Sequence, residues 1–451
     1  MLTPRRATLS CASLQSKEDM AQEIELKFIV NPPVINALSE KLSGLSQEQH
    51  EASRLVNIYY ETPDNFLRRH NMGLRIRGNG NRYEMTMKTS GQVTGGLHQR
   101  PEYNVPLSEP TLDLALLPAE IWPQGVDIAE LQQQLNPLFS TNFNRQTWIV
   151  QQGMSRIELA LDQGEVVAGD LQEPICELEL ELLEGEASAL LILAEQLVNE
   201  PGLRMGSLSK AARGYHLAQG AVERSIKPLS LLSLAPKTTI EQALKASLAQ
   251  SLESWLYHEE LWLRGNRAAR QHILLAAGNV RHVLALFGGI IPRKASSQLR
   301  DLLLSFEASL AEHDKGESVL FSAQASITKL TLTRWLFESQ WRDYVDEKGR
   351  TKLDGSLKRF ADGHLSRHSA ELRAIFQRPL GDAYAEKLTR LVRELDAARL
   401  LAGIYRAEQA SPWLENWQGL FDAISTNQIV EIEHYRNEAI SQAPFWLHSG
   451  K

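Results

Sequence analysis

The sequence predicts an α+β protein, in which an antiparallel β-barrel tunnel of about eight strands, covered by helices, is followed by an all-α helical bundle. Up to about residue 219, short segments of alternating apolar and polar residues are separated by Gly, Asn, Asp and Pro, the pattern of strands and turns. From about residue 237, apolar residues recur three and four positions apart, which is the helical period. The 451 residues also exceed what one core normally serves, so at least two domains are expected.

The composition is that of a globular chain, with 43% hydrophobic and 23% charged residues. A net charge of -7 argues against non-specific nucleic-acid binding by the whole chain, although it leaves room for a local basic pocket. Cys11 and Cys176 are the only cysteines, which fits a reducing cytoplasm. No apolar run approaches the roughly 20 residues that cross a bilayer. We therefore expect a cytoplasmic protein with no membrane partner and no specific nucleic-acid partner.

Residues 1–19 are polar and precede Met20, which opens the first charged strand. They lack the apolar core of a secretory signal. One interpretation is a weak targeting segment. The other, which we favour, is a disordered extension that arises from an upstream start codon.

Two segments of the first half carry a charge at every second position: "AQEIELKF", residues 21–28, and "PICELELEL", residues 174–182. Side chains alternate between the two faces of a strand, so each segment has one apolar and one charged face. The charged positions are Glu23, Glu25 and Lys27 in the first segment and Glu177, Glu179 and Glu181 in the second. Intervening strands repeat the pattern with Arg75, Arg77, Lys88, Arg100, Glu102, Arg156, Glu158 and Asp162.

An ordinary sheet with its charged face in water explains any single one of these strands. The whole set favours a barrel with its charges inside. Like charges two residues apart repel unless something positive lies between them, and helices of this half could cover the apolar faces from outside. Buried charges persist only when they are paired or bind ions, so the ligand is expected to be an anion accompanied by a cation. Arginine and lysine suit phosphate oxygens, and clustered carboxylates suit Mg2+ or Mn2+.

The segments "EIELKF", "LRIR", "TMK", "QRPEYN", "RIELALDQGEV", "CELELEL" and "SLSKAARGY" follow one another between residues 20 and 219. In this order they resemble the CYTH superfamily, the triphosphate tunnel metalloenzymes, whose signature is ExExK. The helical remainder resembles a CHAD domain. This order of domains is that of bacterial inorganic triphosphatases.

The resemblance implies hydrolysis of inorganic triphosphate to pyrophosphate and phosphate, with Mg2+ or Mn2+ as the cofactor. It implies metal coordination by Glu23, Glu25, Glu177, Glu179 and Glu181. It implies phosphate contacts from Lys27, Arg75, Arg77, Lys88, Arg100, Arg145 and Lys210. Catalytic roles fall to Lys27, Glu102 and Lys210, while the general base stays open between Glu102, Glu177 and a tunnel lysine. Glu158 and Asp162 would orient these groups or pair within the wall.

We therefore expect four parts: an extension at 1–19, a CYTH catalytic domain at 20–219, a linker at 220–236 and a CHAD-like domain at 237–451. All candidate groups precede residue 220, so residues 20–219 should carry catalysis alone. Activity on thiamine or nucleoside triphosphates, or non-catalytic binding of polyphosphate, are the alternatives. Polyphosphate is a second expected partner, at the helical half. However, Leu274, Gly278 and Asn279 stand where the CHAD family has basic or polar groups, so we expect that binding to be weak.

Overall fold

The computed structural model describes residues 21–447. The extension expected at residues 1–19 lies outside the described residues. Ten strands form one antiparallel sheet, and pairing of β1 with β6 closes eight of them into a barrel, since β10 and β5 lie outside the ring. The predicted barrel of about eight strands is thereby confirmed. In barrel order the strands are β1 (Ala21–Val30), β9 (Leu171–Glu184), β8 (Ser155–Ala168), β7 (Asn136–Gln152), β2 (Glu48–Glu61), β3 (Gly73–Asn79), β4 (Arg82–Lys88) and β6 (Leu97–Leu107).

The barrel is apolar on its outside. Leu26 and Phe28 of β1 are fully buried in one large core, together with Leu190 and Leu193 of α4 (Ser188–Leu197). The helix α1 (Ile35–Leu45) contributes Leu38 and Leu42 to the same core. A second core lies outside β3 and β4, where Leu74, Met85 and Met87 pack with residues of α2 (Phe66–Arg69) and α3 (Ile128–Gln134). The apolar side chains of the strands therefore face outward, as expected for a barrel with its charges inside.

One end of the barrel is filled by α5 (Lys210–Ala218) and a third apolar cluster. Tyr215 packs edge-on against Phe139, whose ring stacks on Tyr59 at 4.6 Å between centroids. A Cβ atom on Gly214 would lie 2.1 Å from the Phe139 ring, so only glycine allows α5 to approach β7 this closely. The hydroxyl of Ser209 accepts the N–H of Ala212 and fixes where the helix begins.

Regular secondary structure from residue 240 to residue 447 is helical, as predicted. The long helices are α6 (Ile240–Leu263), α7 (Ala269–Leu286), α8 (Ser297–Glu312), α10 (Ala323–Phe337), α12 (Leu357–Phe376), α13 (Leu388–Ala402), α14 (Ala407–Ser425) and α15 (Ile429–Ser441). The short ones are α9 (Gly316–Leu320) and α11 (Glu347–Leu353). Residues 219–239, which include the expected linker, form neither a helix nor a strand.

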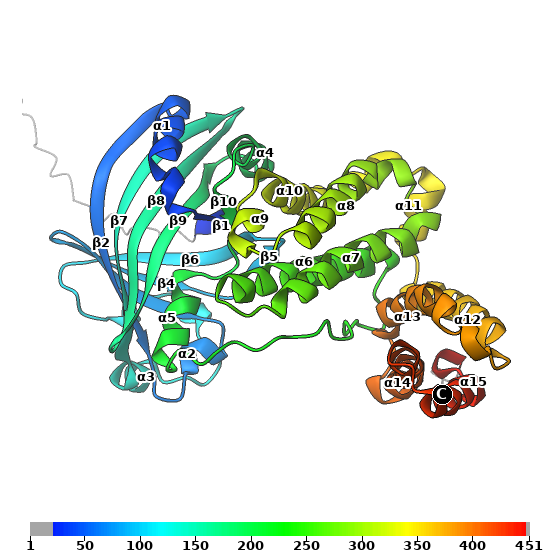
Figure 1. The fold of residues 1–451 in the computed structure, drawn as a ribbon. Helices are drawn as coiled ribbons and strands as arrows, with labels where there is room; N and C mark the ends of the chain where they lie inside the picture. Colours follow the sequence, from blue (N-terminus) through cyan, green and yellow to red (C-terminus); the bar gives the residue numbers. More distant parts are fainter. Residues whose placement is uncertain (1–20, 448–451) are drawn as a thin grey trace, which may run out of the picture.

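The two halves pack against each other on one side of the barrel. Figure 1 shows α6, α9 and α10 beside the barrel and α12 to α15 at the far end of the molecule. The edge strands β10 (Leu203–Met205) and β5 (Gln92–Thr94) lie on the side that faces these helices. Between residues 21 and 447, no helix has both the length and the apolar character needed to cross a membrane.

Candidate active site

The interior of the barrel contains a cavity of about 1010 Å³ that is lined mainly by charged and polar side chains. The charged ones come from β1, β3, β4, β6, β7, β8, β9, α2 and α5, so nearly the whole ring contributes. Of the residues singled out from the sequence, those that line the cavity are Glu23, Glu25, Lys27, Arg75, Arg77, Lys88, Arg100, Glu102, Arg145, Glu158, Glu179, Glu181 and Lys210. Glu177 and Asp162 are fully buried behind this lining.

Near α5 the charges form a compact network, called here the inner cluster: Lys27, Arg145, Asp162, Glu177, Glu179, Lys210 and Arg213. The Nζ atoms of Lys27 and Lys210 each lie 2.9 Å from Glu179 Oε1. Both lysines also pair with Glu177, which Arg213 holds from behind at 2.5 Å. Burial alone would lower the pKa of Lys27, but the charges of Glu177 and Glu179 raise it, so this lysine keeps its proton.

Arg145 completes the inner cluster by binding Asp162 with both Nε and Nη2, at 2.7 and 2.6 Å. The same Nη2 lies 2.7 Å from Glu179. Oxygens of Asp162, Glu177 and Glu179 all lie within 4.8 Å of one another, a spacing that could hold a metal ion. Four basic side chains already compensate these three carboxylates, so the arrangement is closed by the chain's own charges.

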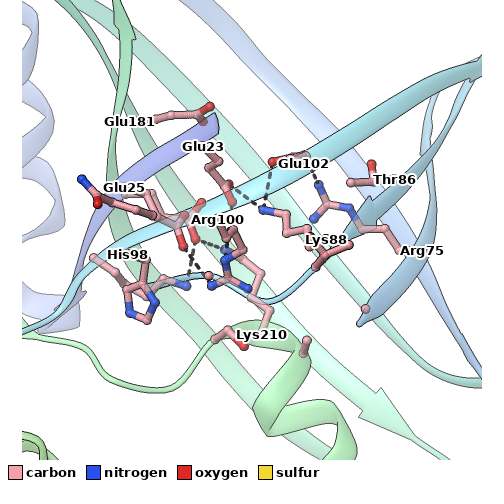
Figure 2. Close-up of a pocket in the computed structure, with 18 of the residues that line it drawn as sticks. Glu23, Glu25, Arg75, Thr86, Lys88, His98, Arg100, Glu102, Glu181 and Lys210 are labelled. Carbon is pink, nitrogen blue, oxygen red and sulfur yellow. Dashed lines mark hydrogen bonds and ion pairs between the residues drawn. The ribbon is translucent and has the colours of Figure 1, made fainter. Parts of the chain in front are cut away.

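A second group of carboxylates, called here the carboxylate face, consists of Glu23, Glu25 and Glu181. Figure 2 shows these three side chains near one another, with Lys88 between Glu23 and Glu102. Lys88 lies 2.5 Å from Glu23 and 3.2 Å from Glu102, and Arg100 approaches Glu23 and Glu25 only to 3.7 and 3.6 Å. Within residues 21–447, Glu181 has no basic side chain at ion-pair distance.

The carboxylate face has an excess of negative charge. Burial and the charge of Glu23 raise the pKa of Glu181 to about 7. Burial, opposed by Lys88 and reinforced by Glu25, raises the pKa of Glu23 to about 6. Glu23 Oε2 is buried and accepts no hydrogen bond from the described residues. A divalent cation would relieve this repulsion, and carboxylate oxygens are its preferred ligands, so the residues present fit such a cation.

The opposite wall has an excess of positive charge. Arg77 donates from Nε to Asn57 Oδ1 at 2.9 Å, and no carboxylate of the described chain forms an ion pair with it. Burial and the neighbouring charges of Arg75 and Arg145 lower its pKa to about 10. Arg75 pairs only loosely with Glu102, at 3.7 Å. Burial alone would raise the pKa of Glu102, but Lys88 and Arg75 lower it to about 2. An anion is the group that this wall lacks.

The sequence analysis did not single out several residues of the site, among them Arg68, His98 and Arg213. His98 lines the cavity next to Glu25, with which it is paired across strands β6 and β1. Burial lowers the pKa of His98 to about 4. It shares the strand face of Arg100 and Glu102, so the alternation contained the signal. Arg213 lies one helical turn after Lys210 on α5. Residues three positions apart lie on the same side of a helix, so Lys210 and Arg213 share one side of α5. This spacing could be read from "SLSKAARGY".

Comparison with protein families identifies both halves. Residues 21–215 match the CYTH domain, and residues 246–436 match the CHAD domain. The chain carries a CYTH domain followed by a CHAD domain. The cavity lies entirely within the CYTH domain, because its lining residues run from Gln22 to Tyr215.

The CYTH domain is similar to an inorganic triphosphatase from Haemophilus influenzae, with 41% identity over 203 residues. The aligned part is 44% of this chain and 55% of that relative, so the chain spans about half the length of the relative. A putative adenylyl cyclase from Hippeastrum with a dominant triphosphatase activity is 20% identical over 43% of this chain and 95% of that one, with a TM-score of 0.34. The CHAD domain of Ricinus communis is 16% identical over 49% of this chain and 91% of that one, with a TM-score of 0.35.

Proposed function

We propose that the chain is a metal-dependent inorganic triphosphatase, which hydrolyses triphosphate to pyrophosphate and phosphate inside the barrel. The observation that carries this proposal is the division of one cavity between a basic wall, where Arg77 has no carboxylate partner among the described residues, and the carboxylate face, where Glu181 has no basic partner among them. A polyanion bound together with Mg2+, or Mn2+, neutralises both. The 41% identity to an inorganic triphosphatase over the CYTH domain supports the same activity. A cytoplasmic location is part of the proposal, because two cysteines in 451 residues fit a reducing compartment.

In this mechanism Arg75, Arg77 and Arg100 bind phosphate oxygens, with Lys88 beside them. Lys27, Lys210 and Arg145 hold the far end of the triphosphate. Since the pKa values of both lysines are raised by neighbouring carboxylates, they stabilise developing negative charge as cations and do not act as proton acceptors. When bound, the metal would neutralise phosphate charge and lower the pKa of the attacking water. The metal would be held by Glu23, Glu25 and Glu181. Glu179, two residues before Glu181 on β9, would lie at the edge of this set.

Two roles suggested by the resemblance are reassigned in this proposal. Glu177 is enclosed by Lys27, Lys210 and Arg213, so it positions the two lysines and is not a metal ligand. Glu102 has a pKa lowered to about 2 by Lys88 and Arg75, which makes it a poor proton acceptor near neutral pH. It therefore orients Lys88 and Arg75.

Bare triphosphate is favoured over a nucleotide or thiamine triphosphate by what lines the cavity. Among its described lining residues, the phenol rings are those of Tyr59 and Tyr215, and both belong to the apolar cluster at α5. Both phenol rings are packed within the protein and so do not offer a free face on which a base could stack, which leaves the imidazole of His98 as the one aromatic ring among the described lining residues outside this cluster.

Phosphate release from triphosphate, ATP and thiamine triphosphate tests the proposal. With Mg2+, triphosphate should give the highest kcat/KM, and EDTA should abolish release. The Glu25→Ala, Glu181→Ala variant should lose turnover by orders of magnitude while it stays folded. A folded double variant with full activity would contradict the metal assignment. Binding of triphosphate without hydrolysis under every metal tested would instead indicate a non-catalytic binding module.

Weak polyphosphate binding by the CHAD domain is a second proposal, and a cavity of about 300 Å³ between α7, α12 and α13 supports it. His282, His364 and Arg367 line this cavity. Its basic groups are largely paired with acids: His282 with Asp396, His368 with Glu394, Arg390 with Glu371 and Arg393 with Glu394. Binding should therefore weaken steeply with salt and depend on exposed Arg367. Tight binding that resists salt would contradict it.

A further inference from the structure

The hairpin of β5 and β6 forms one wall of the charged cavity. Gln92 and Val93 line the cavity just before the hairpin turn, and His98 and Arg100 line it just after the turn. The turn consists of Gly95 and Gly96, both with positive φ. A shift of this turn would therefore be transmitted within a few residues to side chains that face the ligand.

The tip of this hairpin is seated in the CHAD domain. The hydroxyl of Thr333, on α10, lies 2.7 Å from the carbonyl oxygen of Gly95 and 3.0 Å from that of Lys329 in its own helix. Gly95 has φ +56°, and a Cβ atom there would lie 2.5 Å from Thr333 Oγ1 and 2.6 Å from Leu252 Cδ2 of α6. The seat therefore accepts only glycine. Figure 1 shows β5 reaching toward α6 at this point.

Strand β10 is a second tie between the domains. The N–H of Gly202 donates to Phe321 O at 2.7 Å, and Arg204 Nη2 lies 2.8 Å from Glu260 of α6. On its other side β10 pairs with β1, and the N–H of Gly206 donates to Lys27 O at 2.9 Å. The same helices thus support the hairpin and the strand beside Lys27.

We propose that Gly95 and Thr333 are positioning residues, through which the CHAD domain holds the β5–β6 wall in the geometry that binds triphosphate. The proposal rests on the proposed function of the cavity. It differs from the expectation that residues 20–219 carry catalysis alone, since under this proposal a side chain beyond residue 220 sets the position of a cavity wall.

Steady-state kinetics of triphosphate hydrolysis by the full chain test this role. Thr333→Val keeps the shape of the side chain but removes the donor. KM for triphosphate should rise about fivefold, the equivalent of one net hydrogen bond, while kcat changes less than about twofold. Thr333→Ser retains the hydroxyl and should restore KM. Gly95→Ala, which adds a steric clash, should raise KM at least as much as Thr333→Val.

Two matched variants control for changes in stability. Thr328→Val removes a buried hydroxyl from the same helix, but this hydroxyl donates at 2.7 Å to Gln324 O inside the helix. Gly80→Ala imposes the same backbone strain at φ +59°, with no atom within 4 Å of the new Cβ. Both controls should leave KM unchanged, with the folded fraction checked by circular dichroism.

Isothermal titration of triphosphate in EDTA gives a readout that does not need turnover, and it should show the same loss of affinity in Thr333→Val and Gly95→Ala. Wild-type KM and affinity in both variants would overturn the inference, and so would equal losses in the controls or failure of Thr333→Ser to restore KM. Absence of hydrolysis by the wild-type chain would overturn the proposed function instead, while the titration would still decide the positioning role.

Discussion

Arg77 is the residue whose environment most directly indicates an anion. Its guanidinium is held by a neutral amide, and its pKa is lowered to about 10 by burial and by Arg75 and Arg145. A cation kept in place without a counter-charge is costly unless a ligand supplies one. The cost of this arrangement in the free protein is consistent with binding of a multiply charged ligand.

Replacement of Arg77 by Ala should lower kcat/KM for triphosphate, because a charged contact in a buried site is lost. The expected loss of transition-state stabilisation is roughly 2 to 4 kcal/mol. Arg156→Ala is the control, since that side chain is 44% exposed and pairs with Glu48 only at 3.9 Å. Phosphate-release kinetics measure both. A folded Arg77→Ala variant with wild-type kcat/KM would mean that this arginine only balances the wall.

Glu181 makes the stability of the metal-free protein depend on pH. Its pKa is about 7 in the folded chain and 4.5 for the ordinary group, so the folded state binds more protons between these values. Stability contributed by this group is therefore present below about pH 4.5 and is lost as pH rises toward 7. Groups with lowered pKa, such as His98, act in the opposite sense, so a comparison with a variant is needed.

In EDTA, Glu181→Gln should gain stability relative to the wild type as pH rises from 4.5 to 7, because the buried charge no longer forms. Urea unfolding at pH 5 and pH 7.5 measures the difference. Added Mg2+ should stabilise the wild type more than the variant at the higher pH. A difference that is independent of pH would show that Glu181 does not titrate in this range.

At the scale of elements, α5 is positioned by one close contact and by its buried charges. Gly214 lets the helix approach Phe139, and this brings Lys210 and Arg213 to Glu177. Lys210 is carried by the same helix that packs on the apolar cluster at this end of the barrel. A substitution at a small residue of α5 can therefore change the position of Lys210 from a distance.

Gly214→Ala should destabilise the protein by about 1 to 3 kcal/mol, since the new methyl group overlaps the Phe139 ring. Gly44→Ala, in α1, meets no atom within 4 Å and should instead stabilise the protein by up to about 1 kcal/mol. Thermal or urea unfolding distinguishes the two. The two substitutions are expected to change stability in opposite directions. Destabilisation by both variants, or by neither, would therefore contradict this account of α5.

At the scale of the whole molecule, a buried ion pair lies where the domains meet. Lys329 and Glu259 are both fully buried, with Nζ 2.7 and 2.6 Å from the two carboxylate oxygens. Trp255 Nε1 donates to the same carboxylate at 2.7 Å, and Arg204 of β10 approaches it to 3.9 Å. Because β10 is hydrogen-bonded to β1 of the barrel, and α6 and α10 belong to the CHAD domain, this ion pair links the stabilities of both domains.

The full chain should therefore unfold in one calorimetric transition, and Glu259→Ala should destabilise it by about 3 to 5 kcal/mol, because Lys329 would be left buried and unpaired. Glu307→Ala is the control, since Arg281, its partner, is 32% exposed and can be solvated. Separate transitions for the two domains in the wild-type chain would contradict the linkage.

The sequence by itself determined the fold class and which side of each barrel strand is charged, because side-chain alternation is a local property of a strand. The charged candidates on the strands, from Glu23 to Glu181, could be chosen in this way, whereas Arg145 and Lys210 followed only from the resemblance to the CYTH family. Only the tertiary structure decided which charges compensate one another. The register of the barrel strands pairs Lys27 with Glu179 and Glu25 with Glu181. As a result the carboxylates of the inner cluster are compensated by cations, whereas those of the carboxylate face are not fully compensated. The contact of Gly95 with Thr333 joins residues 238 positions apart, and no local pattern could predict it, because it depends on how two separately folded surfaces meet.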